Sequence, residues 1–344
     1  MKVALTFNLR SSSWKYNLGK GSEDFFAEWD EESTIEAVRD ALRQYHEVVL
    51  IEADDEAFEK LRRERPDIVF NMSEGLHGAS RESHIPAMLE FLGIPYTGSD
   101  PLTLALCLDK SRAKEVLSYH GLPTAKFQVF SSPGEPLTLE RFPLIVKPLY
   151  EGSSKGIWSN SVVRSEDELK KGIEKILLTY KQPALVEEYL EGREFTVALL
   201  GNGEETKVLP VIEILVHSLP KEIEPIYSYE AKWILDTADN PIEIFRCPAE
   251  IDPSLKGKIE QVCLEAFKVL RCRDWCRIDL RLDASGMPHI LELNPLPGVL
   301  PNPDSHSCFP KAAFTAGITY QELICEVLQI ASRRVGLLST LKEV

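Results

Sequence analysis

A polar turn between two apolar runs is the feature that most restricts how this chain folds. Residues 278–282 and 289–293 alternate apolar and polar side chains, and the turn 283–286 (DASG) separates them. Alternation on both sides of a turn that ends in glycine predicts an antiparallel β-hairpin. Because opposed side chains of a hairpin lie about 5 Å apart, the pattern also predicts which polar groups share a face.

Three oxygen-bearing side chains lie on or just beyond these strands, and Arg277 opens the first strand. Strand alternation places Asp279 opposite Glu292, with Asn294 two residues further on the same side. Hard oxygen donors without a thiol or imidazole suit Mg²⁺, and a cation between carboxylates removes their repulsion. The hairpin therefore predicts a magnesium site with Arg277 directed at a reacting group. The alternative is a surface hairpin in which Arg277 pairs with Glu292.

Composition excludes several classes of protein. The 344 residues suffice for two or three domains, 44% of them are hydrophobic, and the formal net charge is −15 without any basic run, which argues against nucleic-acid binding. No apolar run reaches the roughly 20 residues of a membrane span, and the start turns polar too early for a signal peptide. Seven scattered cysteines indicate free thiols in a reducing compartment. We expect a cytoplasmic protein with small-molecule substrates and no nucleic-acid or membrane partner.

Short apolar runs alternate with helical patterns over the first part of the chain, which predicts a small parallel α/β layer. Strands are expected at 3–7, 48–51 and 68–71, with helices from a capping-box pattern at 33–36 and around 85–92. A second, α+β unit should contain a helix through 109–110 to about 120, strands at 125–130 and 144–146, and a helix opened by a capping box at 165–168.

The third unit should consist of strands at 185–189, 194–200 and 208–214, a helix that starts at Pro253 after the N-cap Asp252, and the hairpin. A last helix is expected to open with a capping box at 319–322.

Two further segments carry polar groups at strand ends. Lys147 ends an apolar strand and precedes a Gly/Ser-rich loop at 149–156, whose backbone N–H groups could hold phosphate oxygens, although the spacing is not that of a Walker loop. A surface turn is the alternative. Glu187 and Glu188 interrupt an apolar run and Glu194 opens the next strand, a pattern that suits ribose and purine binding.

Several of these segments occur in the order and at the approximate spacings of one family. They are "PYTGSD" with "LDKSRAK", "VKPLYEGSSKG", "VEEYLEGREFTVA", "YEAKW" and "CRIDLRLDASGMPHILELNPLPG". On these segments the chain resembles the ATP-grasp superfamily, and within it the D-alanine–D-alanine ligase family, over nearly its whole length. The resemblance implies an α/β (α+β) fold of three domains. These are an N-terminal parallel-sheet (pre-ATP-grasp) domain at 1–99 and two α+β domains at 100–184 and 185–344 that hold the nucleotide between them.

The resemblance also implies an activity. It is that of an ATP-dependent ligase which forms a dipeptide through an acyl phosphate in peptidoglycan precursor synthesis, with ATP, two Mg²⁺ ions (Mn²⁺ as a substitute) and a homodimer. The nucleotide ligands that it implies are Lys110, Lys147, Glu151, Ser153, Ser154, Glu187, Glu188, Leu190, Glu194 and Lys232. The implied metal ligands are Asp279, Glu292 and Asn294. Arg277 and the backbone N–H of Gly298 would stabilise the tetrahedral intermediate, with Ser153 near the first substrate.

The substrate side departs from the family pattern. The stretch "NLRSSSWKYNLGKG" (8–21) replaces a glycine-rich turn, so Glu31 or Glu32 is the nearest candidate for the glutamate that binds the first substrate's ammonium. An acidic helix N-terminus is the alternative reading of either residue. Trp233 stands where a tyrosine often follows the lysine, and an indole donates a hydrogen bond but cannot accept one.

The rim of the second substrate site also differs, because residues 301–304 lengthen the loop after the metal-binding asparagine. Ser307 keeps the position of a serine that binds the second substrate's carboxylate, and Glu74 keeps a family-like position in 71–78. Two alternatives stay open: a ligase that joins other amino acids or a specialised metabolite, and a non-catalytic nucleotide-binding homologue.

Overall fold

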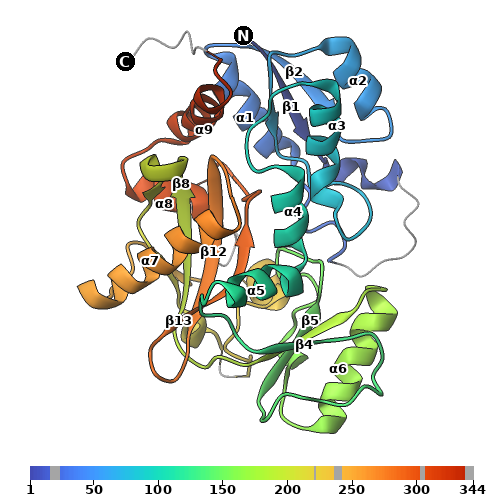
Figure 1. Ribbon diagram of the computed structural model, residues 1–344, viewed down its shortest axis with the longest axis vertical. Coiled ribbons are helices and arrows are strands. Elements are labelled where there is room, and N and C mark those ends of the chain that lie inside the picture. The colour runs from blue at the N-terminus through green and yellow to red at the C-terminus, as the bar shows by residue number, and fades with distance from the viewer. Residues whose placement is uncertain (16–23, 221, 236–241, 303–306, 338–344) are drawn as a thin grey trace.

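The computed structural model describes residues 1–15, 24–220, 222–235, 242–302 and 307–337. The described residues form three β-sheets with helices around them (Figure 1). The first sheet has the order β2-β1-β3 and all its strands are parallel. Its strands are β1 (Lys2–Phe7), β2 (Glu47–Glu52) and β3 (Ile68–Asn71), and its helices are α1 (Glu32–Arg43), α2 (Ala57–Glu64) and α3 (His84–Leu92). The predicted parallel α/β layer is confirmed.

The predicted capping box at the start of α1 is wrong. The chain is already helical at Glu32, the N-cap position falls on Glu31, and the Glu31 side chain makes no capping hydrogen bond. Ser33 therefore lies inside the first turn, where its hydroxyl cannot cap the helix.

The second sheet is antiparallel, with the order β4-β7-β5-β6. Its strands are β4 (Phe127–Phe130), β5 (Leu144–Pro148), β6 (Val162–Val163) and β7 (Ala184–Glu188), and α4 (Pro101–Leu108), α5 (Lys110–Tyr119) and α6 (Glu166–Thr179) belong to the same stretch of chain. The helix expected with 109–110 in its first part is α5, which Asp109 caps by accepting from the N–H groups of Ser111 and Arg112 and which is followed by His120. The preceding α4 is a separate helix that ends before Asp109. Ser165 caps α6, but Glu168 accepts from the Arg164 N–H, so the second predicted box is incomplete.

The third sheet contains the predicted hairpin, in the order β11-β10-β8-β12-β13 with β9 paired to β8. Its strands are β8 (Glu194–Leu200), β9 (Lys207–Val208), β10 (Ile212–Ile214), β11 (Phe245–Arg246), β12 (Trp275–Leu282) and β13 (Pro288–Asn294), and its helices are α7 (Pro253–Val269), α8 (Cys308–Thr315) and α9 (Tyr320–Arg334). The strand expected at 208–214 is divided into β9 and β10 around Pro210, which has no N–H to donate. The caps at Asp252 and Thr319 are confirmed.

The first and third sheets share one hydrophobic core. Val3 and Leu5 of β1 and the apolar face of α1 pack in one cluster with Trp275 of β12, Phe309 of α8 and the buried face of α9. The second sheet has a separate core, in which α6 packs on β5 and β7. Figure 1 shows this sheet and α6 extending below the rest of the molecule. The three predicted domain boundaries stay a prediction. The strand expected at 185–189 in the third unit is β7, which belongs to the second sheet instead, because its backbone pairs with β4 and β5.

A buried aspartate joins distant parts of this shared body. Asp274 is fully buried and has a φ of 64°. Its carboxylate accepts from the Gly98 N–H at 2.7 Å and from Asn202 Nδ2 at 2.8 Å, and it lies 2.8 Å from Arg334 Nη2 on α9. One side chain thus connects the segment after α3, the third sheet and the last helix.

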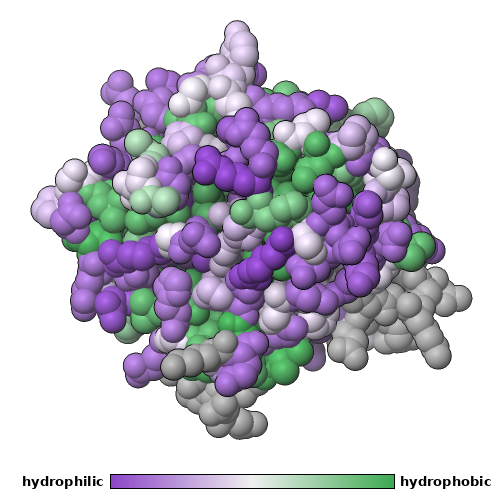
Figure 2. Space-filling model, turned by 90° about the horizontal axis from the view of Figure 1, so that it is seen from below, coloured by the Kyte–Doolittle hydropathy of each residue, from purple (hydrophilic) through white to green (hydrophobic). Residues whose placement is uncertain are grey.

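The surface is predominantly polar. Figure 2 shows hydrophilic side chains over most of one face, with small apolar areas between them. Among the described residues, no helix combines the length and the apolar character that crossing a membrane requires.

Candidate functional site

The hairpin has the register that the sequence predicts. Asp279 lies opposite Glu292 and Arg277 opposite Asn294, and a bulge follows Asp279. Asp279 Oδ2 lies 3.0 Å from Arg277 Nη2 and accepts from Asn294 Nδ2 at 3.1 Å. Thr196 of β8 donates to the other oxygen of Asp279. The alternative pairing of Arg277 with Glu292 is not the one that forms, because Arg277 binds Asp279 on its own strand.

Glu292 pairs instead with a lysine of another element. Lys110, the first residue of α5, is buried, and its Nζ lies 3.2 Å from Glu292 Oε2. Burial alone would raise the pKa of Glu292, but Lys110, Lys147 and Arg277 outweigh burial and hold this pKa at about 2. Glu292 is therefore ionised at neutral pH.

The oxygen atoms at this point fit the predicted magnesium ligands. Two carboxylates and one amide converge from adjacent strands, and hard oxygens of this kind are the donors that Mg²⁺ prefers. Among the described residues, no cluster of three or more His, Cys, Asp and Glu side chains forms a complete metal site. The protein thus offers a partial ligand set, which suits a cation that keeps phosphate oxygens of a substrate in its coordination shell.

A second basic cluster lies at the end of β5. Lys147 Nζ lies 2.6 Å from Glu187 Oε2, and Lys114 Nζ lies 2.8 Å from Glu187 Oε1. Glu187, expected to contact adenine, is itself 1% exposed and ion-paired on both oxygens. Burial lowers the pKa of Lys114, and Glu187 opposes this shift. Sequence reasoning missed Lys114, because a lysine inside a helix carries no signal that it points inward.

A narrow slot of about 120 Å³ lies between the second and third sheets. Nine of the ten expected nucleotide ligands line it: Lys147, Glu151, Ser153, Ser154, Glu187, Glu188, Leu190, Glu194 and Lys232. The tenth, Lys110, lines the adjoining larger cavity. Glu194 lies 3.2 Å from Arg281, yet burial outweighs this partner and raises its pKa to about 7. The slot has an apolar wall of Ile145, Ile226 and neighbouring residues, which suits a flat aromatic base.

The Gly/Ser-rich loop is fastened by a segment that precedes α1. Glu28 accepts from the Gly152 N–H at 2.6 Å, and Asp24 accepts from the Gly156 N–H at 2.8 Å. A Cβ at Gly156, where φ is +75°, would lie 2.2 Å from the ring of Pro148, so only glycine fits there. We call residues 24–31 the N-terminal segment.

Basic side chains complete this fastening. Arg81 Nη2 lies 2.8 Å and Lys155 Nζ 3.2 Å from Glu28, and Lys155 also lies 2.6 Å from Glu151. Burial would raise the pKa of Glu28, but Arg81 and Lys155 outweigh burial and lower it below its usual range. Sequence reasoning missed Asp24 and Glu28, whose partners in the loop are more than 120 residues away in the chain.

The predicted change at Trp233 alters the contact with the loop. Lys232 and Trp233 lie on the π-helical turn Glu230–Leu235. The Trp233 indole donates to the backbone oxygen of Ser153 at 3.2 Å, a contact for which a donor alone is sufficient. Lys232 Nζ lies 5.3 Å above the indole ring, and burial, followed by the charge of Arg277, lowers its pKa to about 8.

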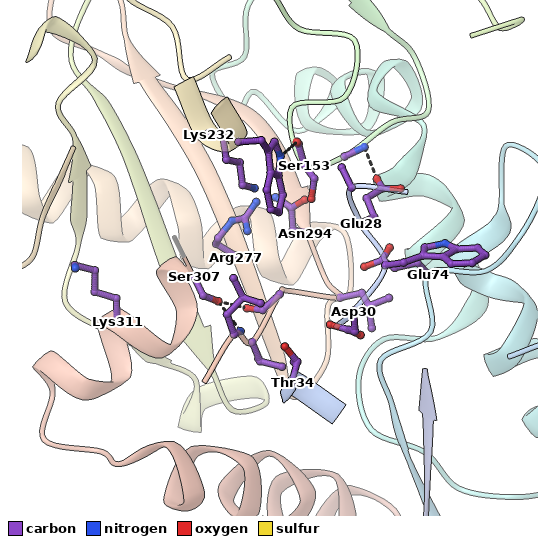
Figure 3. A pocket seen from close by; sticks show the side chains of 18 of the residues that line it. Glu28, Asp30, Thr34, Glu74, Ser153, Lys232, Arg277, Asn294, Ser307 and Lys311 are labelled. Carbon is purple, nitrogen blue, oxygen red and sulfur yellow. Dashed lines mark hydrogen bonds between the residues drawn. The ribbon is translucent and has the colours of Figure 1, made fainter. Parts of the chain in front are cut away.

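A cavity of about 1260 Å³ adjoins the slot and reaches from the N-terminal segment to α8 (Figure 3). Seven residues expected to contact substrates or the intermediate line it: Glu31, Glu74, Ser153, Trp233, Arg277, Gly298 and Ser307. Glu32, the alternative to Glu31, is exposed and does not line the cavity. Glu31 lies 3.2 Å from Arg10, and it is the neighbouring Glu28 that contacts the loop. Ser307 donates to the Gly298 carbonyl at 2.9 Å and accepts from the Leu300 N–H. The roles of these residues stay predictions.

Two expected departures from the family fall partly outside the described residues. The segment 8–21 is described only to residue 15, and of the lengthened loop 301–304 only residues 301 and 302 are described.

Comparisons with known proteins agree with this architecture. The family described as D-ala D-ala ligase C-terminus matches residues 116–329. The D-alanine–D-alanine ligase of Pelotomaculum thermopropionicum is 33% identical over 349 residues, covering 98% of each chain. The uncharacterized protein y4sG of Sinorhizobium fredii is 38% identical over 315 residues, covering 89% of each.

Solved structures show the same fold. A crystal structure of the D-alanine–D-alanine ligase of Bacillus anthracis superposes with a TM-score of 0.71 at 25% identity, over 97% of this chain and 98% of that one. The same enzyme complexed with ATP gives a TM-score of 0.70 at 23% identity, over the same shares of the two chains. The α/β architecture, the hairpin with its paired acids and these relatives together place the chain in the D-alanine–D-alanine ligase family of the ATP-grasp superfamily.

Proposed function

We propose that this protein is an ATP-dependent ligase that joins two amino acids through an acyl phosphate. The observation that carries the proposal is the position of the Arg277, Asp279 and Glu292 cluster, where a narrow apolar slot meets a wide polar cavity. A nucleotide in the slot would present its terminal phosphate at this junction. The carboxylate of an amino acid in the cavity could then reach that phosphate.

The chemistry follows from the groups at the junction. Attack of the donor carboxylate on the γ-phosphorus breaks the bond to ADP and forms an acyl phosphate, which has a good leaving group. The amine of the second amino acid then attacks the acyl carbon, and phosphate leaves as the amide forms and the amine loses a proton. Lys110 and Lys147 would hold the phosphates during transfer. Mg²⁺ bound by Asp279, Glu292 and Asn294 would neutralise charge on the transferred phosphoryl group.

The oxyanion of the second step needs donors that are already in place. Arg277 and the Gly298 N–H are the candidates, and a Cβ built at Gly298 would meet open space, so this backbone is accessible from the cavity. An acyl phosphate hydrolyses if water reaches it. The loop 151–156, fastened over the site by Asp24 and Glu28, would exclude water.

D-alanine as donor and acceptor is the default substrate pair, because several relatives carry the name D-alanine–D-alanine ligase. A role in peptidoglycan precursor synthesis, a cytoplasmic location and a homodimer belong to the same proposal. ADP release should depend on both ATP and an amino acid. The test is a screen of D- and L-amino acids, singly and in pairs, for ADP release with the product mass measured. Absence of ADP release and of a dipeptide mass for every pair contradicts ligation and favours a nucleotide-binding homologue.

A further inference from the structure

One end of the large cavity carries carboxylates without basic partners. Asp30, Glu74 and Glu82 all line it. Within the described residues, no lysine, arginine or histidine nitrogen lies within 4 Å of any of these three side chains. The neighbouring acids differ, because Glu28 and Glu151 are paired with Arg81 and Lys155.

The unpaired acids are held close enough to affect one another. Burial raises the pKa of Asp30 to about 7, and Arg10 only partly opposes the shift. Burial also raises the pKa of Glu82 to about 7, although Arg81 and Lys110 oppose this shift. The pKa of Glu74 rises well above its usual value through burial and the charges of Glu82 and Glu28, with Arg81 only partly opposing them. Such a group of acids favours the arrival of positive charge, because a cation removes the repulsion among them.

A hydroxyl group at the same end also has no partner. Thr34, at the start of α1, is 0% exposed and lines the cavity, and its Oγ1 makes no hydrogen bond to any described residue. A buried hydroxyl that lacks a partner costs free energy. The hydroxyl oxygen could accept a hydrogen bond from an ammonium group. Figure 3 draws Thr34 and Asp30 on the same side of the cavity as Glu74 and Glu28.

The opposite side has a different character. Figure 3 draws Lys311 of α8 far from the acids, with Ser307 between them. The carboxylate of an acceptor suits that basic side, whereas the acids suit the amino side of the donor. An amino acid such as alanine has one ammonium group, whereas three acids line this end of the cavity. The cavity, at about 1260 Å³, also has room for a larger side chain.

We propose that the acyl donor is a diamino acid whose second ammonium group binds among Asp30, Glu74, Glu82 and Thr34. This inference rests on the proposed ligase function and narrows its substrate class. The α-ammonium and the side-chain ammonium would hydrogen-bond to these carboxyl groups and favour their ionised forms. A charged hydrogen bond to the second ammonium discriminates against alanine, which lacks it.

The test compares donors in the full-length protein with ATP and Mg²⁺. Alanine, 2,3-diaminopropionate, 2,4-diaminobutyrate, ornithine and lysine are each supplied as D- and L-forms with a fixed acceptor, and ADP release and product mass are measured. We expect one diamino acid to exceed alanine in kcat/KM by about tenfold or more, the size of one good charged hydrogen bond. Turnover with alanine that equals or exceeds every diamino acid overturns the inference and leaves the ligase proposal standing.

Two cavity variants test where the second ammonium group of the donor binds. Glu74→Gln and Asp30→Asn should reduce the preference for the diamino donor over alanine by about tenfold each, while Glu36→Gln on the exposed face of α1 leaves the preference unchanged. An unchanged preference in both cavity variants contradicts the assignment. Calorimetric binding of each donor to the ADP-bound protein is a second measurement, and a diamino acid that binds no more tightly than alanine contradicts the inference. If no pair of amino acids gives turnover, the ligase proposal fails and the inference fails with it.

Discussion

Glu292 is in contact with both halves of the site, because it lines the nucleotide slot and the substrate cavity and pairs with Lys110 across the junction. Its ionised state depends on that lysine and on Lys147 and Arg277. The residue therefore has two duties: it carries the negative charge that a divalent cation needs, and it keeps a phosphate-binding lysine in place.

Replacing this carboxylate by an amide tests those duties. Glu292→Gln should lower kcat by about a hundredfold or more, because one charged contact at the reacting group is removed, while the protein stays folded. The measurement is steady-state ADP release with Mg²⁺, beside thermal unfolding. Glu265→Gln, on the exposed surface of α7, is the matched control. Normal Mg²⁺-dependent turnover in Glu292→Gln would show that the hairpin is not part of the active site.

Asp30 offers a test of the electrostatics in the cavity that needs no substrate. Its pKa is raised from 3.8 to about 7 by burial, so the folded protein holds this proton more tightly than the unfolded chain. The associated stability is present below about pH 4 and is lost as the pH rises towards 7. Asp30→Asn removes this dependence. The free energy of unfolding of the variant minus that of the parent protein should therefore be larger at pH 8 than at pH 5. Denaturant unfolding of both proteins at the two pH values measures the gain. An equal difference at both values would show that the carboxyl group titrates normally.

At the scale of elements, the N-terminal segment controls the loop over the nucleotide. Asp24 and Glu28 accept from the two loop N–H groups of Gly156 and Gly152, and Glu28 also binds Arg81 and Lys155. Opening the loop therefore requires these contacts to break. An open loop admits water, which hydrolyses an acyl phosphate before the amine attacks.

The segment can be weakened at one residue. Glu28→Ala should raise hydrogen–deuterium exchange in residues 151–156 and increase the ADP released per molecule of dipeptide above one. Glu36→Gln again serves as the exposed control. A variant whose exchange and ADP-to-product ratio match those of the parent protein would show that the loop closes without Glu28.

The contacts of the hairpin could be predicted from the sequence, whereas those of the N-terminal segment could not. Period-two alternation and a glycine turn determine which residues of a hairpin oppose each other, so Asp279 and Glu292 could be paired from the sequence. The caps at Asp252 and Thr319 are likewise local signals. Contacts such as Glu28 with Gly152 lie in irregular chain, and no periodicity links partners so far apart. The inward direction of Lys114 and the split of β9 from β10 also depend on tertiary packing.

At the scale of the whole molecule, the chain consists of one large body and one smaller one. The first and third sheets share a core and are joined at Asp274, whereas the second sheet has its own core with α6. Domain motion is the ordinary expectation where packed units lack a common core. The nucleotide slot lies along the boundary between the two bodies.

The junction at Asp274 can be tested by stability. Arg334→Met leaves a fully buried carboxylate without its main cation, which should lower the free energy of unfolding by about 3 kcal/mol. The neighbouring Arg333 is exposed, so Arg333→Met is the matched control. Both changes lie far from the slot, so the KM for ATP should stay unchanged. A loss that is no larger in Arg334→Met than in Arg333→Met would show that Asp274 does not hold the large body together.

The contacts that hold the loop 151–156 therefore cross the boundary between the two bodies. The loop belongs to the smaller body, while Glu28 and Asp24 extend from the larger one, only a few residues from the acids that face the donor. A ligand that draws Asp30 towards itself would also act on the segment whose Glu28 holds Gly152. Binding of the amino acid and closure of the loop over the nucleotide would then be coupled, so that ATP would react only when an acid is present to receive its phosphate.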